Sequence, residues 1–83
     1  MPVILRYRKI KFVFYSNDHL PIHVHAIYGN YEASCKVILS NLETLNNKGF
    51  TGKDLKLIKK VVKENSDLIE EAWNEFFKKQ TLS

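Results

Sequence analysis

The histidines of this chain gather in one short segment. All three fall between positions 19 and 25, in the stretch DHLPIHVH that begins at Asp18. His23 and His25 are two residues apart, so on a β-strand their side chains lie on the same face. His19 and Asp18 precede them in a loop from which they could fold over that face. The segment therefore predicts a functional pocket built from Asp18, His19, His23 and His25.

A bound metal is one chemistry that this segment allows. His-x-His on a strand is a common ligand arrangement, and His19 or Asp18 would supply a third ligand and leave a position open, as catalytic zinc requires. Two observations oppose a metal: Lys36 is expected opposite His23, where its ammonium disfavours a dication, and the sequence has no CxxC or HExxH motif. The sequence therefore assigns no metal ligands and no cofactor.

Metal-free acid–base catalysis is a second interpretation. Histidine titrates near neutral pH, so a pair can hold one proton donor and one proton acceptor. Cleavage of RNA needs a base for the 2′-hydroxyl proton and an acid for the leaving oxygen, and His23 and His25 would take these roles. Lys36 could stabilise the anionic phosphorane, and Asp18 could orient a histidine. A ribonuclease is therefore a candidate activity.

A third interpretation is structural. Histidines on an exposed or interface-facing strand can simply hydrogen-bond to the backbone or to a carboxylate such as Glu32. The spacing is compatible with catalysis, metal binding and a structural role, and all three stay open here.

A hairpin around Gly29-Asn30 must position the histidines. Two runs of strand-forming residues flank this link, and a Gly-containing two-residue link predicts a hairpin. One face of the hairpin is apolar and the other carries His23 and His25, so a one-residue slip would bury the polar set. The link predicts the cross-strand pairs Tyr28–Tyr31, Ile27–Glu32, Ala26–Ala33, His25–Ser34, Val24–Cys35, His23–Lys36 and Ile22–Val37.

Other segments supply a second hairpin and a loop. Residues 3–7 and 10–15 are rich in β-branched and aromatic residues, which predicts two strands. Residues 46–49 (NNKG) are typical of a loop. Leu42, Leu45 and Phe50 are expected to pack beneath it.

The C-terminal half predicts two amphipathic helices. Thr51-x-x-Asp54 resembles a capping box and starts a helix over about residues 52–64. A second helix, capped by Ser66, is expected over about residues 67–79. Strands followed by helices indicate an α+β fold, here a four-stranded antiparallel sheet followed by two C-terminal helices packed on one face. The chain is short enough to form a single domain, residues 1–83.

The net charge of +4 is concentrated in the first hairpin and on one face of the first helix. Such a surface attracts phosphate backbones, although lysine is also the ordinary solvent-facing residue of a helix. The residues predicted to contact nucleic acid are Arg6, Arg8, Lys53, Lys56, Lys59, Lys60 and Lys63.

Composition excludes several classes of protein. Hydrophobic residues make up 45% and charged residues 27% of the chain, which fits a globular domain. No apolar run is long enough to span a membrane, and the N-terminus lacks the features of a signal peptide. The single cysteine, Cys35, is expected in the core and fits a reducing cytoplasm. Because so short a chain builds a small core, a partner protein or a second copy of the chain would help to cover it.

The chain resembles a small bacterial family, domain of unknown function 4160, over essentially its whole length. The stretch FVFYSNDHLPIHVH at residues 12–25 is similar to the family signature FFFYSxDHxPPHVHV, and EAWNEFF at residues 71–77 is similar to its tail. The MPVILR opening also looks like the family's MPxIxR start. Two departures are Ile22, where the family has a second proline, and Arg8-Lys9, where it has a hairpin glycine.

The resemblance implies a biological context. Genes of this family often lie beside a second small gene, in pairs that look like toxin–antitoxin modules. It therefore implies a cytoplasmic protein with a small protein partner and with RNA as a target. It carries over no catalytic residues. A nucleic-acid-associated protein with a histidine pocket is the leading hypothesis, and a non-catalytic interaction module and a metal-binding protein are its rivals.

Overall fold

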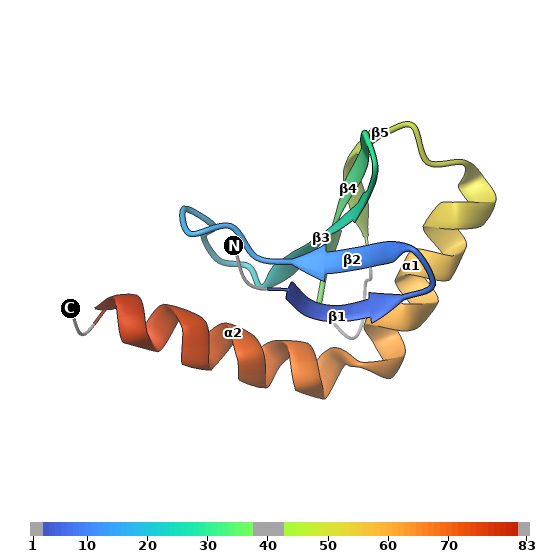
Figure 1. The fold of residues 1–83 in the computed structure, drawn as a ribbon. Coiled ribbons are helices and arrows are strands. Elements are labelled where there is room, and N and C mark those ends of the chain that lie inside the picture. The colour runs from blue at the N-terminus through green and yellow to red at the C-terminus, as the bar shows by residue number, and fades with distance from the viewer. Residues whose placement is uncertain (1–2, 38–42, 82–83) are drawn as a thin grey trace.

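A computed structural model describes residues 3–37 and 43–81 of the chain. The fold is α+β, with one antiparallel sheet followed by two helices, and α2 runs along the sheet and continues past it toward the C-terminus (Figure 1). The sheet has the strand order β1-β2-β3-β4-β5, so every strand pairs with its neighbour in sequence. The elements are β1 (Val3–Tyr7), β2 (Ile10–Val13), β3 (His23–Tyr28), β4 (Tyr31–Lys36), β5 (Thr44–Lys48), α1 (Gly52–Glu64) and α2 (Ser66–Thr81).

The β3–β4 hairpin has the predicted register. The pairs from His23–Lys36 to Tyr28–Tyr31 form as expected, and Ile22 O accepts a hydrogen bond from Val37 N. Gly29 has φ +58°, in the left-handed region that the tight turn requires. The alternation of buried and polar residues therefore predicted this hairpin correctly.

The prediction of four strands was wrong, because the sheet has five. Residues 46–48, predicted as loop, belong to β5, which pairs with β4 along the sheet edge. An edge strand is held by backbone hydrogen bonds on one side, and this one is polar and mostly exposed, so it lacks the apolar alternation by which a strand is recognised in a sequence. Of the residues predicted to pack beneath the loop, Phe50 is buried, Leu45 is exposed and Leu42 lies outside the described residues.

The first hairpin forms as predicted, with one difference at its end. Arg8 adopts a positive φ of 57° and closes the turn without glycine. Strand β2 ends at Val13 rather than at residue 15. The reason is local: Tyr15 O accepts a hydrogen bond from Asp18 N, and the Asp18 carboxylate accepts one from Tyr15 N–H, so the backbone turns away from the sheet.

Both helices form, and the first has the predicted bounds. Thr51 and Asp54 make a complete capping box at the start of α1. Helix α2 starts at Ser66 and extends to Thr81, slightly beyond the predicted range. No helix in the described part of the chain combines the length and apolar character needed to cross a membrane.

The core lies where the apolar sides of the helices meet the sheet. Phe12, Val24 and Cys35 from the strands and Ile58 and Ile69 from the helices are fully buried in one cluster. The remaining buried members of this cluster include Ile10, Phe14, Ala26, Ala33, Val37, Phe50, Val61, Val62 and Trp73. The sheet and both helices thus share one core. His25, between Val24 and Ala26 on β3, points to the other face of the sheet.

Candidate functional site

Asp18, His23 and His25 come together at one end of the sheet. Asp18 is held in the loop after β2, and the two histidines belong to the start of β3. The loop between them contains a cis Leu20–Pro21 peptide bond. The three side chains are largely buried, with exposed fractions of 8%, 19% and 10% for Asp18, His23 and His25.

The Asp18 carboxylate is the centre of the group. Its Oδ2 accepts a hydrogen bond of 2.8 Å from Tyr15 N–H, and its Oδ1 lies 3.0 Å from His25 Nε2 and 3.2 Å from His23 Nε2. Burial by itself raises the pKa of Asp18, but the hydrogen bonds from His25 and Tyr15 and the nearby histidines outweigh it, so the pKa lies below its usual value. Asp18 is therefore an anion at neutral pH.

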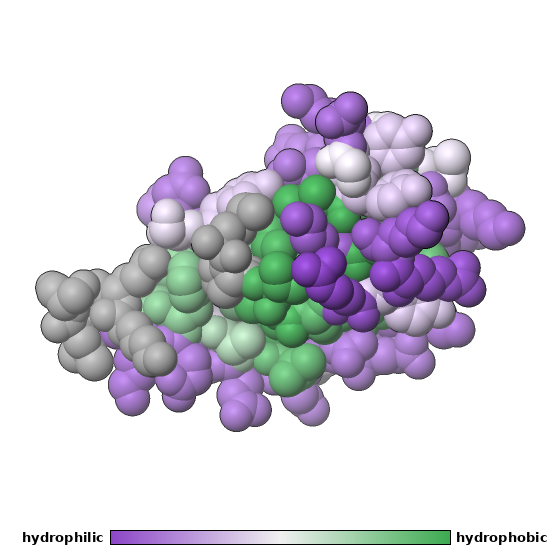
Figure 2. All heavy atoms as spheres, in the orientation of Figure 1, coloured by the Kyte–Doolittle hydropathy of each residue, from purple (hydrophilic) through white to green (hydrophobic). Residues whose placement is uncertain are grey.

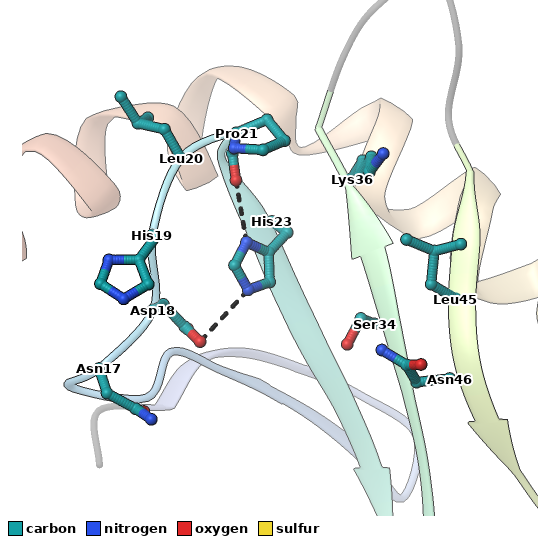
Figure 3. Close-up of a pocket in the computed structure, with 10 residues that line it drawn as sticks. All are labelled: Asn17, Asp18, His19, Leu20, Pro21, His23, Ser34, Lys36, Leu45 and Asn46. Carbon is teal, nitrogen blue, oxygen red and sulfur yellow. Dashed lines mark hydrogen bonds and ion pairs between the residues drawn. The ribbon is translucent and has the colours of Figure 1, made fainter.

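His23 is constrained at both ring nitrogens (Figure 3). Nδ1 lies 2.9 Å from the carbonyl oxygen of Pro21, which can only accept a hydrogen bond, so Nδ1 carries a proton. In a neutral imidazole, Nε2 is then an unprotonated acceptor, and it faces another acceptor, Asp18 Oδ1. Two lone pairs facing each other at this distance repel. A cation between or beside them, either a second proton or a metal ion, removes the repulsion.

His25 is the more enclosed histidine. Nε2 faces both Asp18 oxygens, at 3.0 and 3.2 Å, while Nδ1 lies 3.3 Å from Ser34 Oγ and 3.6 Å from a Glu32 carboxylate oxygen. The Tyr15 ring covers it at a centroid distance of 4.1 Å. Burial and contacts with Glu32 and Asp18 raise the pKa of Tyr15, so it stays a neutral phenol. The His25 ring is thus fixed in orientation.

The arrangement could hold a metal ion, which would replace the proton that His25 Nε2 donates to Asp18. One donor atom from each of Asp18, His23 and His25 lies within 4.8 Å of the others. Ligand atoms about 2.1 Å from one metal lie about 3.0 Å apart in octahedral sites and about 3.4 Å apart in tetrahedral sites, close to the separations of 3.0 and 3.2 Å around Asp18 Oδ1. The other ring nitrogen of each histidine, Nδ1, faces away from Asp18. Nδ1 of His23 faces Pro21 O, and Nδ1 of His25 faces Ser34 and Glu32. Metal-bound histidines have outer hydrogen-bond partners of this kind.

A cleft of about 340 Å³ opens beside the group. Asp18 and His23 reach its wall, with Ser34 and Lys36 from β4 and Asn46 from β5 on the other side (Figure 3). His25 does not line it. A metal ion bound by Asp18 and His23 would therefore be accessible from solvent, and His25 would bind it from the buried side.

The other predicted members of the pocket lie outside this group. His19 is exposed and lines the cleft beside Asp18 and His23. Its ring lies on the opposite side of the loop backbone from His23 (Figure 3), and it has no donor atom in the cluster. Lys36 is opposite His23 as predicted, but its Nζ lies 3.8 Å from a Glu43 carboxylate oxygen. The objection to a metal that rested on Lys36 is therefore weaker than the sequence indicated, because its charge has a partner.

The sequence reasoning did not identify Tyr15, Pro21 and Ser34 as parts of the site. Ser34 was available from the hairpin register, since it is paired with His25. The contacts of Tyr15 and Pro21 depend on the path of the loop, for which the sequence has no periodic pattern.

The predicted nucleic-acid contacts are on the surface, apart from the cleft. Arg6, Arg8 and most lysines of the α1 stripe are exposed, Lys59 is half-buried, and none of them lines the cleft beside Asp18. The exposed members of the stripe are Lys53, Lys56, Lys60 and Lys63.

Comparison with known families agrees with the resemblance seen in the signature. Residues 10–74 match the family described as Domain of unknown function (DUF4160). The chain belongs to this family. The match includes Asp18, His23, His25 and most of both helices. No curated protein and no solved structure matches the chain.

Proposed function

We propose that this member of the DUF4160 family binds a divalent transition metal through Asp18, His23 and His25. The contacts of His23 carry the proposal: Pro21 O fixes the proton on Nδ1, so Nε2 directs a lone pair at the place where Asp18 Oδ1 also points. Two imidazoles and one carboxylate are ligands that zinc and iron(II) sites use, with further positions left for water.

Protonation of His23 is the competing account of the same contacts. A second proton on Nε2 would make an imidazolium paired with Asp18, and the group would then be a structural ion pair. The two accounts differ in what they predict when a metal is added, because only the first gives a stoichiometric binding site.

The adjoining cleft supports a catalytic role for such a centre. A metal at this site would lower the pKa of a bound water toward neutrality, and the cleft gives that water access to a substrate. Lys36 lies on the opposite wall and pairs with Glu43 at 3.8 Å, so it would stabilise an anionic substrate only by exchanging that partner for it. On this basis we propose hydrolysis of a phosphodiester, with RNA as the substrate class.

A metal-free ribonuclease is the alternative for the same cleft. His23 and His25 would then act as acid and base, with Asp18 as the orienting group. The contacts favour the metal, because each ring nitrogen of both histidines already faces a group of the protein, whereas a free acid or base must present one nitrogen to the substrate.

Metal titration tests the proposal. The full chain, stripped with EDTA and dialysed, is titrated with ZnCl₂ in a calorimeter and with CoCl₂ while the visible absorption is followed. We expect one ion per chain, and about a 100-fold or greater loss of affinity in Asp18→Asn and His23→Gln. His19→Ala is the matched control, since His19 lines the same cleft but has no donor atom in the group. Equal affinities in all variants would exclude this site.

Cleavage of total bacterial RNA, assayed with and without EDTA, then separates the activities. Loss of cleavage with EDTA and recovery with Zn²⁺ would support the metal mechanism. Cleavage that survives EDTA and disappears in His23→Gln would support the metal-free one. The absence of cleavage, together with one bound zinc, would leave a metal-binding protein without nuclease activity.

We also propose a cytoplasmic protein that works with a small protein partner, as in a toxin–antitoxin pair, or as a homo-oligomer. The net charge of +4, the single buried cysteine and the small core support this context. Co-expression with the neighbouring small gene product, followed by size-exclusion chromatography with mass measurement, tests it. A monomer that does not change mass in the presence of that product would count against both assemblies.

A further inference from the structure

A second cleft, which we call the turn cleft, lies at the other end of the sheet. His23 is the first residue of β3, whereas Tyr28 is the last, so the strand separates the two clefts. The turn cleft measures about 300 Å³ and is lined by Arg8 and Lys9 of the β1–β2 turn and by Tyr28 and Tyr31 beside the β3–β4 turn. Ile10, Phe50 and Leu57 form its apolar floor.

Its two tyrosines present aromatic surface to solvent. Tyr28 is 42% and Tyr31 44% exposed, and their rings meet edge to face at a centroid distance of 6.1 Å. Tyr31 also packs edge to face against Phe50, at 5.7 Å. Its ring lies over Gly49, where a Cβ atom would overlap it. Tyr31 is therefore held in place while much of its ring stays accessible.

Two cations, Arg8 and Lys9, border the cleft. None of the ion pairs among the described residues includes Arg8 or Lys9, and the Arg8 guanidinium instead lies 5.4 Å from the centre of the Tyr7 ring. Figure 2 shows strongly hydrophilic side chains gathered over the β1–β2 hairpin. Lys53 lies four residues before Leu57 and Lys60 three residues after it, so both lie on the same face of α1 as Leu57. The positive surface therefore continues along α1.

One acidic residue, Asp54, also reaches the turn cleft. Its carboxylate takes part in the capping box, where it accepts a hydrogen bond from Thr51 N–H at 3.4 Å. A carboxylate repels phosphate but accepts hydrogen bonds from the amino groups of bases. Asp54 is therefore expected to lie near the base of a bound nucleotide and away from its phosphate.

We propose that the turn cleft binds single-stranded nucleic acid, with one base against Tyr28 and Tyr31 and the flanking phosphates on Arg8 and Lys9. Base–aromatic stacking beside a positive groove is how proteins hold single strands. A purely acidic ligand would use the cations but not the exposed rings or the apolar floor. The proposal does not depend on the metal centre, because the two clefts share no lining residue.

Fluorescence anisotropy tests this site. A labelled single-stranded RNA of about 12 nucleotides is titrated with the full chain in EDTA, which removes any contribution from a metal. We expect Tyr28→Ala to weaken binding about 5- to 100-fold and Tyr28→Phe to leave it within about twofold, because the ring rather than the hydroxyl stacks. Tyr28 is preferred over Tyr31 for this test, because Tyr31 packs on Gly49 and Phe50.

A charge-matched pair locates the phosphate contact. Lys9→Ala and Lys78→Ala each remove one exposed lysine, but only Lys9 lines the turn cleft. Lys9→Ala should weaken binding and reduce the slope of log K against log salt by about 0.7, whereas Lys78→Ala should do neither. Equal effects of the two lysine variants, or wild-type affinity in Tyr28→Ala, would overturn the proposal. So would the absence of binding at about 100 μM wild-type protein.

Discussion

Replacing Asp18 by asparagine should destabilise the fold as well as remove the proposed metal site. The carboxylate accepts a hydrogen bond from Tyr15 N–H and faces Nε2 of both His23 and His25. Asparagine keeps one acceptor oxygen, which can serve Tyr15, but places a neutral amide against the histidines. The variant therefore loses the charged interactions and retains the local turn.

The magnitude follows from the hydrogen bond that the Asp18 carboxylate accepts from His25. A hydrogen bond to a charged group contributes about 1.5–3 kcal/mol, and this one is partly buried. We expect Asp18→Asn to lower the free energy of unfolding by about 1.5–3 kcal/mol. A domain of this size has a total of about 4–12 kcal/mol. The variant should thus fold, with a substantial part of its stability removed.

Urea denaturation measures this change. The single tryptophan, Trp73, is 5% exposed and lies 5.5 Å from the His23 ring, so its fluorescence reports unfolding. EDTA is present throughout, so that bound metal does not contribute. Glu75→Gln is the control, because it also removes one carboxylate but from an exposed position on α2, and it should change stability by less than about 0.5 kcal/mol.

The pH dependence gives a sharper check. Because the pKa of Asp18 is lower in the folded chain than the usual 3.8, its ionised form stabilises the fold. This contribution is complete above the unfolded value and is lost as the pH falls through the lower folded value. The difference between wild type and Asp18→Asn should therefore shrink in strong acid. A difference below about 0.5 kcal/mol at neutral pH, or one that grows in acid, would refute the role assigned to the carboxylate.

Three further predictions concern the core and the turns. Burial raises the pKa of the Cys35 thiol to about 11 from 9.0, so the reactive thiolate is about 100-fold scarcer than in the unfolded chain. Iodoacetamide at pH 8 should therefore label the native protein at least about 100-fold more slowly than the urea-unfolded protein. Equal labelling rates would contradict the burial of Cys35. Gly49→Ala should lower the free energy of unfolding by about 1–3 kcal/mol, because φ is +97° and the new Cβ would overlap the Tyr31 ring. Thermal unfolding measures this loss. Gly29→Ala is the comparison, because there only the φ angle is unfavourable. Thr51→Ala should lower the free energy of unfolding by about 1 kcal/mol, because the hydrogen bond that Thr51 Oγ1 accepts from Asp54 N–H is lost. Thr51→Ser should keep this hydrogen bond. An unchanged urea midpoint in Thr51→Ala would show that the cap does not stabilise α1.

The fold was predictable where a local pattern coincided with tertiary packing. The β3–β4 register followed from the position of Gly29-Asn30 and the contrast between its two faces, and α1 followed from Thr51, Asp54 and a regular apolar stripe. The fifth strand was missed because its residues are polar and exposed. Its pairing with β4 is a property of the neighbouring strand, which no pattern within residues 44–48 records.

The candidate site was predicted in composition but not in geometry. The sequence placed His23 and His25 on one strand face, since alternation alone determines that. It offered His19 and Asp18 equally as their neighbour. The structure brings in Asp18 and leaves His19 exposed, because Tyr15 N–H and the two histidines hold the carboxylate inward.

Local sequence patterns thus specified the two hairpins, both helices and the histidine pair, since each depends on residues close together along the chain. Tertiary structure decided the rest. It closed the loop so that Pro21 O fixes the proton on His23 and Asp18 faces its other nitrogen, it paired Lys36 with Glu43, and it gathered the turn cleft from both hairpins and α1. These contacts join groups whose relative positions are set by the path of a loop and the packing of separate elements, and such positions leave no periodic signal in the sequence.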